Sequence, residues 1–256
     1  MRRVRDGVAT TVADRLVVEA PLELRLGSVP IAVLMRTPGD DSDLARGFAL
    51  TEGIVLRPEE FAEARPIGDE DHDARIELVL AEGVSVDPER FRRNLYATSS
   101  CGVCGKASID AVRVAARTPP EGPVISGDLL WDMEKEMASR QVAFAETGGL
   151  HAAAIFGAAG SMVVIREDIG RHNAVDKAVG HLAPGTWPLG ERVMVVSGRV
   201  SFEVVQKAAV AGIPLIAGVS AASSLAVDLA EELGMTVIGF LREGGFTIYT
   251  GEHRIS

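Results

Sequence analysis

Cysteine and long apolar runs are both scarce in this chain of 256 residues, and each scarcity narrows the class of protein. The two cysteines are so close in sequence that a disulfide between them would close too short a loop to stabilise the fold much, so they suit a reducing cytosol better than a structural disulfide. Because no apolar stretch approaches the length of a membrane span, we expect a soluble cytoplasmic protein without a membrane partner. Lys and Arg number 26 against 36 Asp and Glu, and this excess of acid argues against nucleic-acid binding. Any anion-binding site must therefore be local.

The composition that remains is that of a globular protein. Hydrophobic residues make up 47% of the chain and charged residues 24%, which is enough for a substantial core in one or two domains.

The first part of the chain predicts a small mixed α+β domain. Residues 22–26 alternate between leucine and charged side chains, and a Gly-Ser turn separates them from an apolar run at 31–34, which predicts a β-hairpin. An acidic run at 40–43 can cap a helix over 44–50, and residues 75–80 alternate like another strand.

A proline-rich connector at 118–123 indicates a domain boundary, so we predict domains 1–120 and 121–256. Beyond it, a helical pattern through 129–137 is followed by short apolar runs that alternate with helices. The runs are 162–165, 193–196, 213–217 and 236–240, and the helices lie near 172–182, 201–211 and 223–233. This alternation is typical of a layered α/β sheet, so the chain is predicted to be α/β, or α+β overall.

Both cysteines lie in one short motif, Cys101-Gly102-Val103-Cys104. Two thiols this close in a glycine-rich stretch suit sulfur chemistry, and a helix predicted over 108–116 would lower a thiol pKa at its N-terminus. Lys106 either favours the thiolate or is an ordinary surface lysine. Thioredoxin-like redox chemistry is not favoured, because the motif does not follow the first strand of a βαβ unit.

Three loops rich in glycine or serine follow predicted strands: Ser197-Gly198-Arg199, the run from Ser220 to Ser224, and the run from Leu241 to Gly245. In open α/β sheets such loops gather at the carboxyl edge of the strands, where backbone N–H groups bind phosphates. They predict a site for a nucleotide-like ligand. The alternative is that each is a turn that needs small residues.

The segment from Arg166 to Asn173 concentrates charge directly after a hydrophobic strand. One hypothesis is that Arg166, Arg171 and His172 meet a polyanionic ligand, while Asp168 and Asn173 orient them or read a base edge. The alternative is an ion-pair network at a domain or subunit interface.

A zinc site is a weaker hypothesis. His151 and His172 could join Cys101 and Cys104 to complete a tetrahedral ligand set, but the spacing matches known zinc motifs poorly. A structural role for His151 is the alternative.

Four motifs, in order along the chain, together closely resemble the FdhD family, the sulfurtransferases needed to make active formate dehydrogenase. They are Cys101–Lys106, Arg166–Lys177, Ser197–Glu203 and Phe240–Gly245.

The resemblance implies a protein that accepts sulfur as a persulfide from a cysteine desulfurase. It would pass this sulfur to the molybdenum (or tungsten) bis-guanine-dinucleotide cofactor, bound as cargo, for delivery to formate dehydrogenase. Cys101 matches the persulfide-bearing cysteine, and Cys104 is a second thiol that assists transfer or release. The alternative is a non-catalytic chaperone that binds the cofactor.

The predicted site follows from the residues and the resemblance together. Cys101 and Cys104 form the reactive pair, no metal site or permanent cofactor is expected, and the cofactor-binding set is Arg166, Arg171, His172, Ser197, Arg199, Phe240, Leu241, Arg242, Glu243, Gly244 and Gly245.

The resemblance also implies a C-terminal domain similar in fold to cytidine deaminases. Deaminase chemistry is not expected, because His151-Ala152-Ala153 lacks the glutamate of the H-x-E motif. A homodimer is predicted from the family and from the apolar residues Leu225, Val227 and Leu229.

Overall fold

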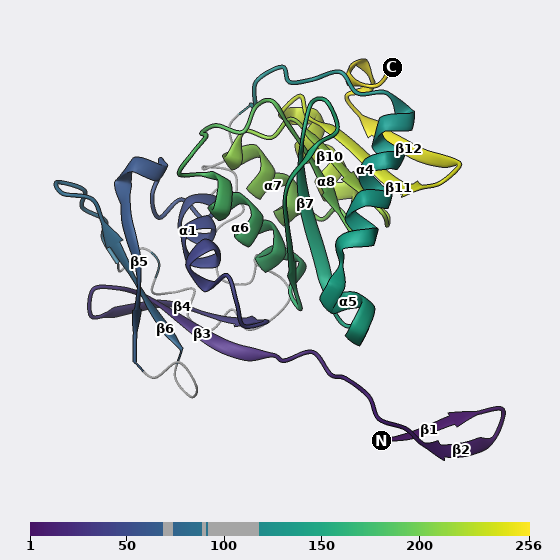
Figure 1. The fold of residues 1–256 in the computed structure, drawn as a ribbon. Coiled ribbons are helices and arrows are strands. Elements are labelled where there is room, and N and C mark those ends of the chain that lie inside the picture. Colours follow the sequence, from purple (N-terminus) through teal and green to yellow (C-terminus); the bar gives the residue numbers. More distant parts are fainter. Residues whose placement is uncertain (69–73, 89–90, 92–117) are drawn as a thin grey trace.

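The described residues form two larger β-sheets with helices packed between and around them (Figure 1). The computed structural model describes residues 1–68, 74–88, 91 and 118–256. The prediction of a mixed α/β chain is confirmed.

A four-stranded sheet with strand order β4-β3-β6-β5 belongs to the first part of the chain. Its strands are β3 (Ala20–Leu26), β4 (Val29–Arg36), β5 (Phe61–Ile67) and β6 (Arg75–Leu80). The predicted β3–β4 hairpin is confirmed, because the alternating leucines of β3 all point into the core. The sequence pattern did not predict β5, in which buried positions recur irregularly.

Helix α1 (Asp41–Thr51) packs on this sheet and buries Leu44, Ala45 and Leu50 against it. Asp40 precedes the helix without capping it through its side chain. Asp41 instead forms an ion pair with Arg36 of β4, with Arg36 Nη2 2.7 Å from Asp41 Oδ2. A short 3-10 helix, η1 (Pro58–Glu60), leads into β5.

A six-stranded sheet with order β12-β11-β10-β9-β7-β8 forms the centre of the second part. Strands β9, β10 and β11 run parallel, and the remaining pairs are antiparallel. Its strands are β7 (His151–Gly157), β8 (Met162–Asp168), β9 (Arg192–Val196), β10 (Leu215–Gly218), β11 (Thr236–Arg242) and β12 (Gly245–Thr250). The predicted layered α/β sheet is confirmed.

Both faces of this sheet are buried, which is why its parallel strands read as continuous apolar runs. Ala153 and Ile155 of β7 face a core shared with α6 (Arg171–Leu182), α7 (Phe202–Ala211) and α8 (Ser224–Glu232). Their neighbours Ala152, Ala154 and Phe156 face the opposite core under α4 (Gly127–Arg140). A short helix, α5 (Val142–Thr147), follows α4, and η2 (Glu252–Arg254) lies near the C-terminus.

Helix α1 packs directly against α6 and so joins the two sheets (Figure 1). Trp187 contacts the cores on both sides of this junction. The two larger sheets fall on either side of residue 120, but the division into domains 1–120 and 121–256 stays a prediction.

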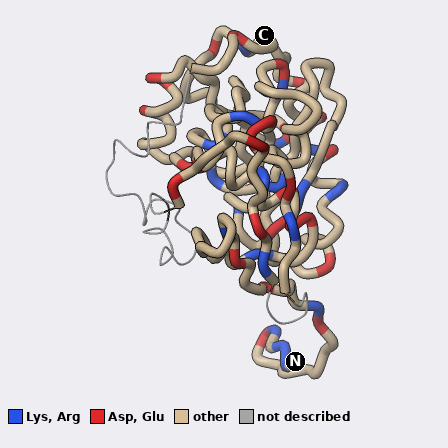
Figure 2. The backbone as a smooth tube through the Cα atoms, turned by 90° about the vertical axis from the view of Figure 1, so that its left-hand side faces the viewer, with Lys and Arg blue, Asp and Glu red and all other residues tan. Residues whose placement is uncertain are grey.

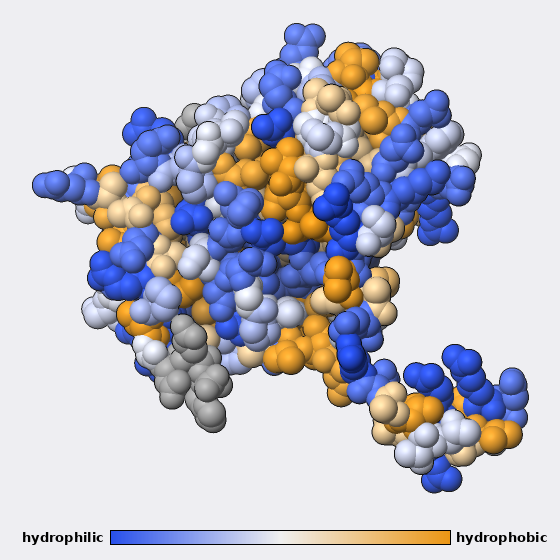
Figure 3. Space-filling model, viewed as in Figure 1, coloured by the Kyte–Doolittle hydropathy of each residue, from blue (hydrophilic) through white to orange (hydrophobic). Residues whose placement is uncertain are grey.

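A two-stranded hairpin of β1 (Arg2–Arg5) and β2 (Val8–Thr11) precedes the body. Every residue of its strands is exposed, and it stands clear of the rest of the molecule (Figure 3). Along the described parts of the chain, no helix combines the length and the apolar composition that crossing a membrane requires.

Candidate functional site

The loops after β9 and β10 meet at the carboxyl edge of the six-stranded sheet. Val200 N donates to Ala221 O over 3.1 Å, and Ser223 N donates to Val200 O over 3.0 Å. Strand β11 reaches the same place, because Phe240 N donates to Ser220 O over 3.0 Å. The prediction that these three segments gather at one edge is confirmed.

The third segment is not a loop throughout, so that part of the prediction is wrong. Strand β11 continues to Arg242, which pairs with Gly245 across a tight turn into β12. Phe240 has φ 53° at an irregularity of this pairing and is exposed, whereas Leu241 is fully buried in the core under α4. The irregularity turns Leu241 inward, so its side chain cannot face a ligand.

The other residues of this hairpin are on the surface. Arg242, Glu243, Gly244 and Gly245 are exposed, and Glu243 forms an ion pair with Lys135 of α4 over 3.6 Å. These residues therefore form a projecting rim beside the loops.

Ser197 and His151 join the edge from neighbouring strands. Ala152 N donates to Ser197 Oγ over 2.8 Å, which fixes the start of β7 against the end of β9. Both side chains line a cavity of about 390 Å³ beneath α4 and α5. Glu134, Gln141 and Phe144 lie on its other wall.

Arg171 and Arg199 supply positive charge at this edge. Burial, then Arg171 and Arg199, lower the pKa of His151, and Asp168 acts in the opposite direction. Arg171 begins α6 and is half-buried, whereas Arg199 is exposed in the loop after β9. The two predicted residues therefore lie within electrostatic reach of one cavity-lining histidine.

His172 lies behind the edge and supports it. Its Nε2 is 3.2 Å from Ser201 Oγ and 3.6 Å from Glu203 Oε2, and its side chain is 14% exposed. Burial, followed by Lys207 and Arg171, lowers the pKa of His172 to about 4. A buried, neutral histidine is suited to holding the start of α7 in place.

Arg166 points to the junction of the two sheets. Its Nη2 is 2.9 Å from Asp43 Oδ2, and its Nε is 3.4 Å from Asp40 Oδ2. Asp43 also pairs with His181 Nδ1 over 3.0 Å. Arg166 therefore takes part in an ion-pair network where the two sheets meet, as the alternative hypothesis expected.

Asp168 and Asn173 belong to the same junction. The fully buried Asp168 accepts from Thr37 N over 3.1 Å and pairs with Lys177 Nζ over 2.8 Å. Asn173 Nδ2 donates to Met35 O over 2.8 Å. Seen from the left-hand side of Figure 1, basic and acidic residues are interspersed along the described chain (Figure 2).

The sequence patterns missed a buried polar cluster at the same junction. Lys207 of α7 contacts Asp176 of α6 and both Thr51 and Glu52 at the end of α1. A signal was present, since Lys207 lies four residues after Glu203 in a helix whose other residues, apart from Gln206, are apolar.

The reactive pair Cys101 and Cys104, with Lys106 and the helix predicted over 108–116, lies outside the described residues. Among the residues that are described, no three His, Asp or Glu side chains gather in a way that could hold a metal ion. Because Cys101 and Cys104 lie outside the described residues, the zinc hypothesis stays untested.

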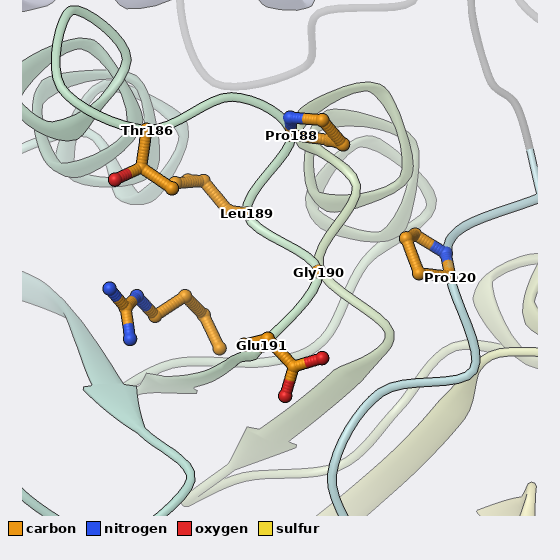
Figure 4. A pocket seen from close by; sticks show the side chains of 7 residues that line it. Pro120, Thr186, Pro188, Leu189, Gly190 and Glu191 are labelled. Atoms are coloured by element: carbon orange, nitrogen blue, oxygen red, sulfur yellow. The ribbon is translucent and has the colours of Figure 1, made fainter.

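A second cavity, of about 490 Å³, lies at the opposite edge of the sheet (Figure 4). Its lining comes from the loop before β9 and from Pro120 of the connector, and includes Pro188, Leu189 and Glu191. None of the predicted site residues that the structure describes lines this cavity. The positions of the predicted residues therefore favour the carboxyl edge of the sheet, and not this second cavity, as the candidate site.

Of the apolar residues behind the homodimer prediction, Leu229 is buried in the core of its own chain, whereas Leu225 is 51% exposed. The homodimer stays a prediction.

The fold and the candidate site define a mixed α/β protein that gathers polar loops at the carboxyl ends of the parallel strands of a mixed sheet, where open α/β sheets bind their ligands. The FdhD/NarQ family model matches residues 17–256, and the chain belongs to this family. The resemblance inferred from the motifs is confirmed.

Relatives extend over nearly the whole chain. It is 49% identical over 266 residues to the sulfur carrier protein FdhD of Streptomyces avermitilis, covering 99% of this chain and 93% of the relative. It is 46% identical over 270 residues to the protein of the same name from Mycobacterium tuberculosis, covering 100% and 98%.

A crystal structure from Desulfotalea psychrophila, with the provisional name formate dehydrogenase accessory protein, has a similar fold. The TM-score is 0.78 at 20% identity, and the match covers 100% of this chain and 97% of that one. At this identity the likeness concerns the fold alone.

Proposed function

We propose that this chain is a sulfur carrier that transfers sulfur to the molybdenum (or tungsten) bis-guanine-dinucleotide cofactor of formate dehydrogenase. Family membership and the names of the relatives support sulfur transfer. The observation that carries the binding half of the proposal is the meeting of the loops at 197–199 and 220–224 beside Arg171 and Arg199.

The chemistry begins at Cys101. Its thiolate attacks the outer sulfur of a persulfide on a cysteine desulfurase, and the desulfurase cysteine leaves as a thiolate. Cys101 then carries the transferable sulfur. The Cys104 thiolate then attacks the inner sulfur of this persulfide, which is the Sγ atom of Cys101. The outer sulfur leaves as sulfide and passes to the cargo. That step leaves a Cys101–Cys104 disulfide, which a thiol reductant must reduce before the next cycle.

The cargo is proposed to bind through its phosphates. Exposed Arg199 and half-buried Arg171 provide cations, and the loops offer backbone N–H groups of the kind that bind phosphate oxygens. The cavity beside Ser197 and His151 adds an enclosed surface for an uncharged part of the ligand.

Sulfur transfer is tested by mass spectrometry after the purified protein is incubated with an active cysteine desulfurase and cysteine. We expect one added sulfur atom on the wild type and on Cys104→Ala, located by peptide analysis at Cys101. Cys101→Ala should gain no sulfur atom. It should also fail to activate formate dehydrogenase in a host that lacks its own copy of this protein. Full activation by Cys101→Ala would contradict the proposal.

Cargo binding is tested with diguanosine diphosphate as the probe. Because a hydrogen bond to a charged group contributes about 1.5–3 kcal/mol, Arg199→Gln should weaken binding roughly tenfold or more. Arg65→Gln is the matched control, since Arg65 is an exposed arginine on the distant strand β5. Equal losses in both variants would mean that only general electrostatic attraction is involved.

A second candidate is a binding chaperone in which the cysteines only contact the partner. It is favoured by the separation in sequence between the two cysteines and the described residues that form the edge and its cavity, which fall within 134–242. Absence of sulfur on the wild type, together with intact binding of the probe, would establish this candidate instead.

A further inference from the structure

His151 occupies a position from which it can respond to a bound ligand. It begins β7 at the carboxyl edge and lines the cavity together with Ser197 and Glu134. Its ring also packs against the loop after β9. A Cβ atom built on Gly198 would lie 3.2 Å from His151 Nδ1 and 3.4 Å from Cε1, so the imidazole lies directly on the glycine backbone.

Among the described residues, the charged groups around His151 come from four separate elements. Arg171 of α6 and Arg199 of the loop are cationic, while Asp168 of β8 lies opposite His151 in the strand register. Glu134 of α4 lines the far wall of the same cavity. Burial and the two arginines outweigh Asp168, so the pKa of His151 is lowered and its ring is neutral at neutral pH.

We propose that His151 takes up a proton from solvent when a phosphate-bearing ligand binds at this edge, so that the site binds anions more tightly as the pH falls. The inference rests on the proposed function, because it concerns the same site. It adds a role for His151 and a dependence of ligand affinity on pH, neither of which is part of the binding proposal.

The physical reason is electrostatic. A phosphate between Arg171 and Arg199 offsets the two charges that oppose protonation of His151, and it offers the imidazolium a negative partner. Linkage makes the effect reciprocal, because a ligand that favours the protonated histidine must bind more tightly to the protonated protein. One titrating group limits the effect to about tenfold in affinity per pH unit.

His172 cannot substitute for His151 in this role. It lies behind the loop between Ser201 and Glu203, with its side chain 14% exposed, and it does not line the cavity. The structure therefore assigns the proton uptake to one histidine of the two.

The test is isothermal titration calorimetry with diguanosine diphosphate, whose phosphates carry no titratable proton near neutral pH. Titrations at one pH between 6 and 7 in buffers of different ionisation enthalpy count the protons taken up with the ligand. We expect a fractional uptake of up to one proton for the wild type and almost none for His151→Asn. His253→Asn is the control, since His253 is exposed near the C-terminus, far along the chain from the site.

Guanosine is the matched ligand control. It lacks phosphate, so any binding should proceed without proton uptake in every variant. Binding without proton uptake in the wild type, or with equal uptake in His151→Asn, would overturn the inference and leave the binding proposal standing. Failure of diguanosine diphosphate to bind at any pH would overturn both.

Discussion

Lys207 of α7 donates to both carboxylate oxygens of Asp176 on α6, with Nζ 2.9 Å from Oδ1 and 2.8 Å from Oδ2. The same ammonium group donates to Thr51 Oγ1 and Glu52 Oε1, each over 2.9 Å. One lysine thus joins α1 to the two helices that carry His172 and Glu203 behind the candidate site.

Burial alone would lower the pKa of Lys207, but Asp176 and Glu52 raise it overall, so the lysine remains charged. Burial raises the pKa of Asp176 to about 6, although Lys207 opposes this. The cluster is satisfied only while all of its members are present.

Lys207→Met should therefore destabilise the protein by about 3–5 kcal/mol, because it leaves the buried carboxylate of Asp176 without its cationic partner. Chemical denaturation monitored by circular dichroism measures the change. Lys135→Met, which removes an exposed pair with Glu243, should change stability by less than about 1 kcal/mol. A similar small change for Lys207→Met would show that the cluster does not hold the helices together.

Gly47→Ala should destabilise the protein, although alanine favours helices more than glycine does. A Cβ atom at Gly47 of α1 would lie 1.8 Å from the carbonyl oxygen of Asp176 on α6, so the two helices would have to separate. Overpacking of this kind costs about 1–3 kcal/mol.

The control for Gly47→Ala is Gly185→Ala, because a Cβ atom at Gly185 would make an ordinary contact of 3.8 Å. We expect a change within about 0.5 kcal/mol for this variant. If Gly47→Ala were instead stabilising, the close approach of α1 and α6 would be contradicted.

His172 should make stability fall as the pH falls from 6.5 towards 4, the range over which burial, Lys207 and Arg171 lower its pKa. In that range the unfolded chain binds a proton at this histidine and the folded protein does not, so protonation favours unfolding. The full effect is about 3 kcal/mol.

The measurement compares unfolding free energies of the wild type and His172→Asn across this pH range. Asp176 acts in the opposite direction, because its pKa is raised on folding, and comparison with the variant separates the two groups. His253→Asn, which changes an exposed histidine, should keep the pH dependence of the wild type. Identical pH profiles for the wild type and His172→Asn would exclude a buried neutral His172.

Much of the fold followed from local patterns. The leucine alternation in β3 and the apolar runs of β8 to β11 predicted their strands because both depend on neighbours close in sequence. Strand β5 and the hairpin of β1 and β2 were missed. The first has irregular burial, and the second buries no side chain, so neither carries a clear periodicity.

The candidate site divides in a similar way. The order of strands and loops was enough to predict that residues 197–199 and 220–224 share an edge, because parallel strands place their carboxyl ends together. It was not enough to show that Leu241 turns inward. That depends on an irregular pairing with β12, which local hydrophobicity does not reveal.

The sequence by itself determined the family, the α/β alternation and the cysteine pair, because motifs and periodicity are properties of short segments. Only the tertiary structure decided the partners of the charged residues. Arg166 meets Asp43 across 123 positions, and Lys207 meets Thr51 across 156. Such pairs depend on how α1 packs against the second sheet's helices, and this packing is a property of the whole chain.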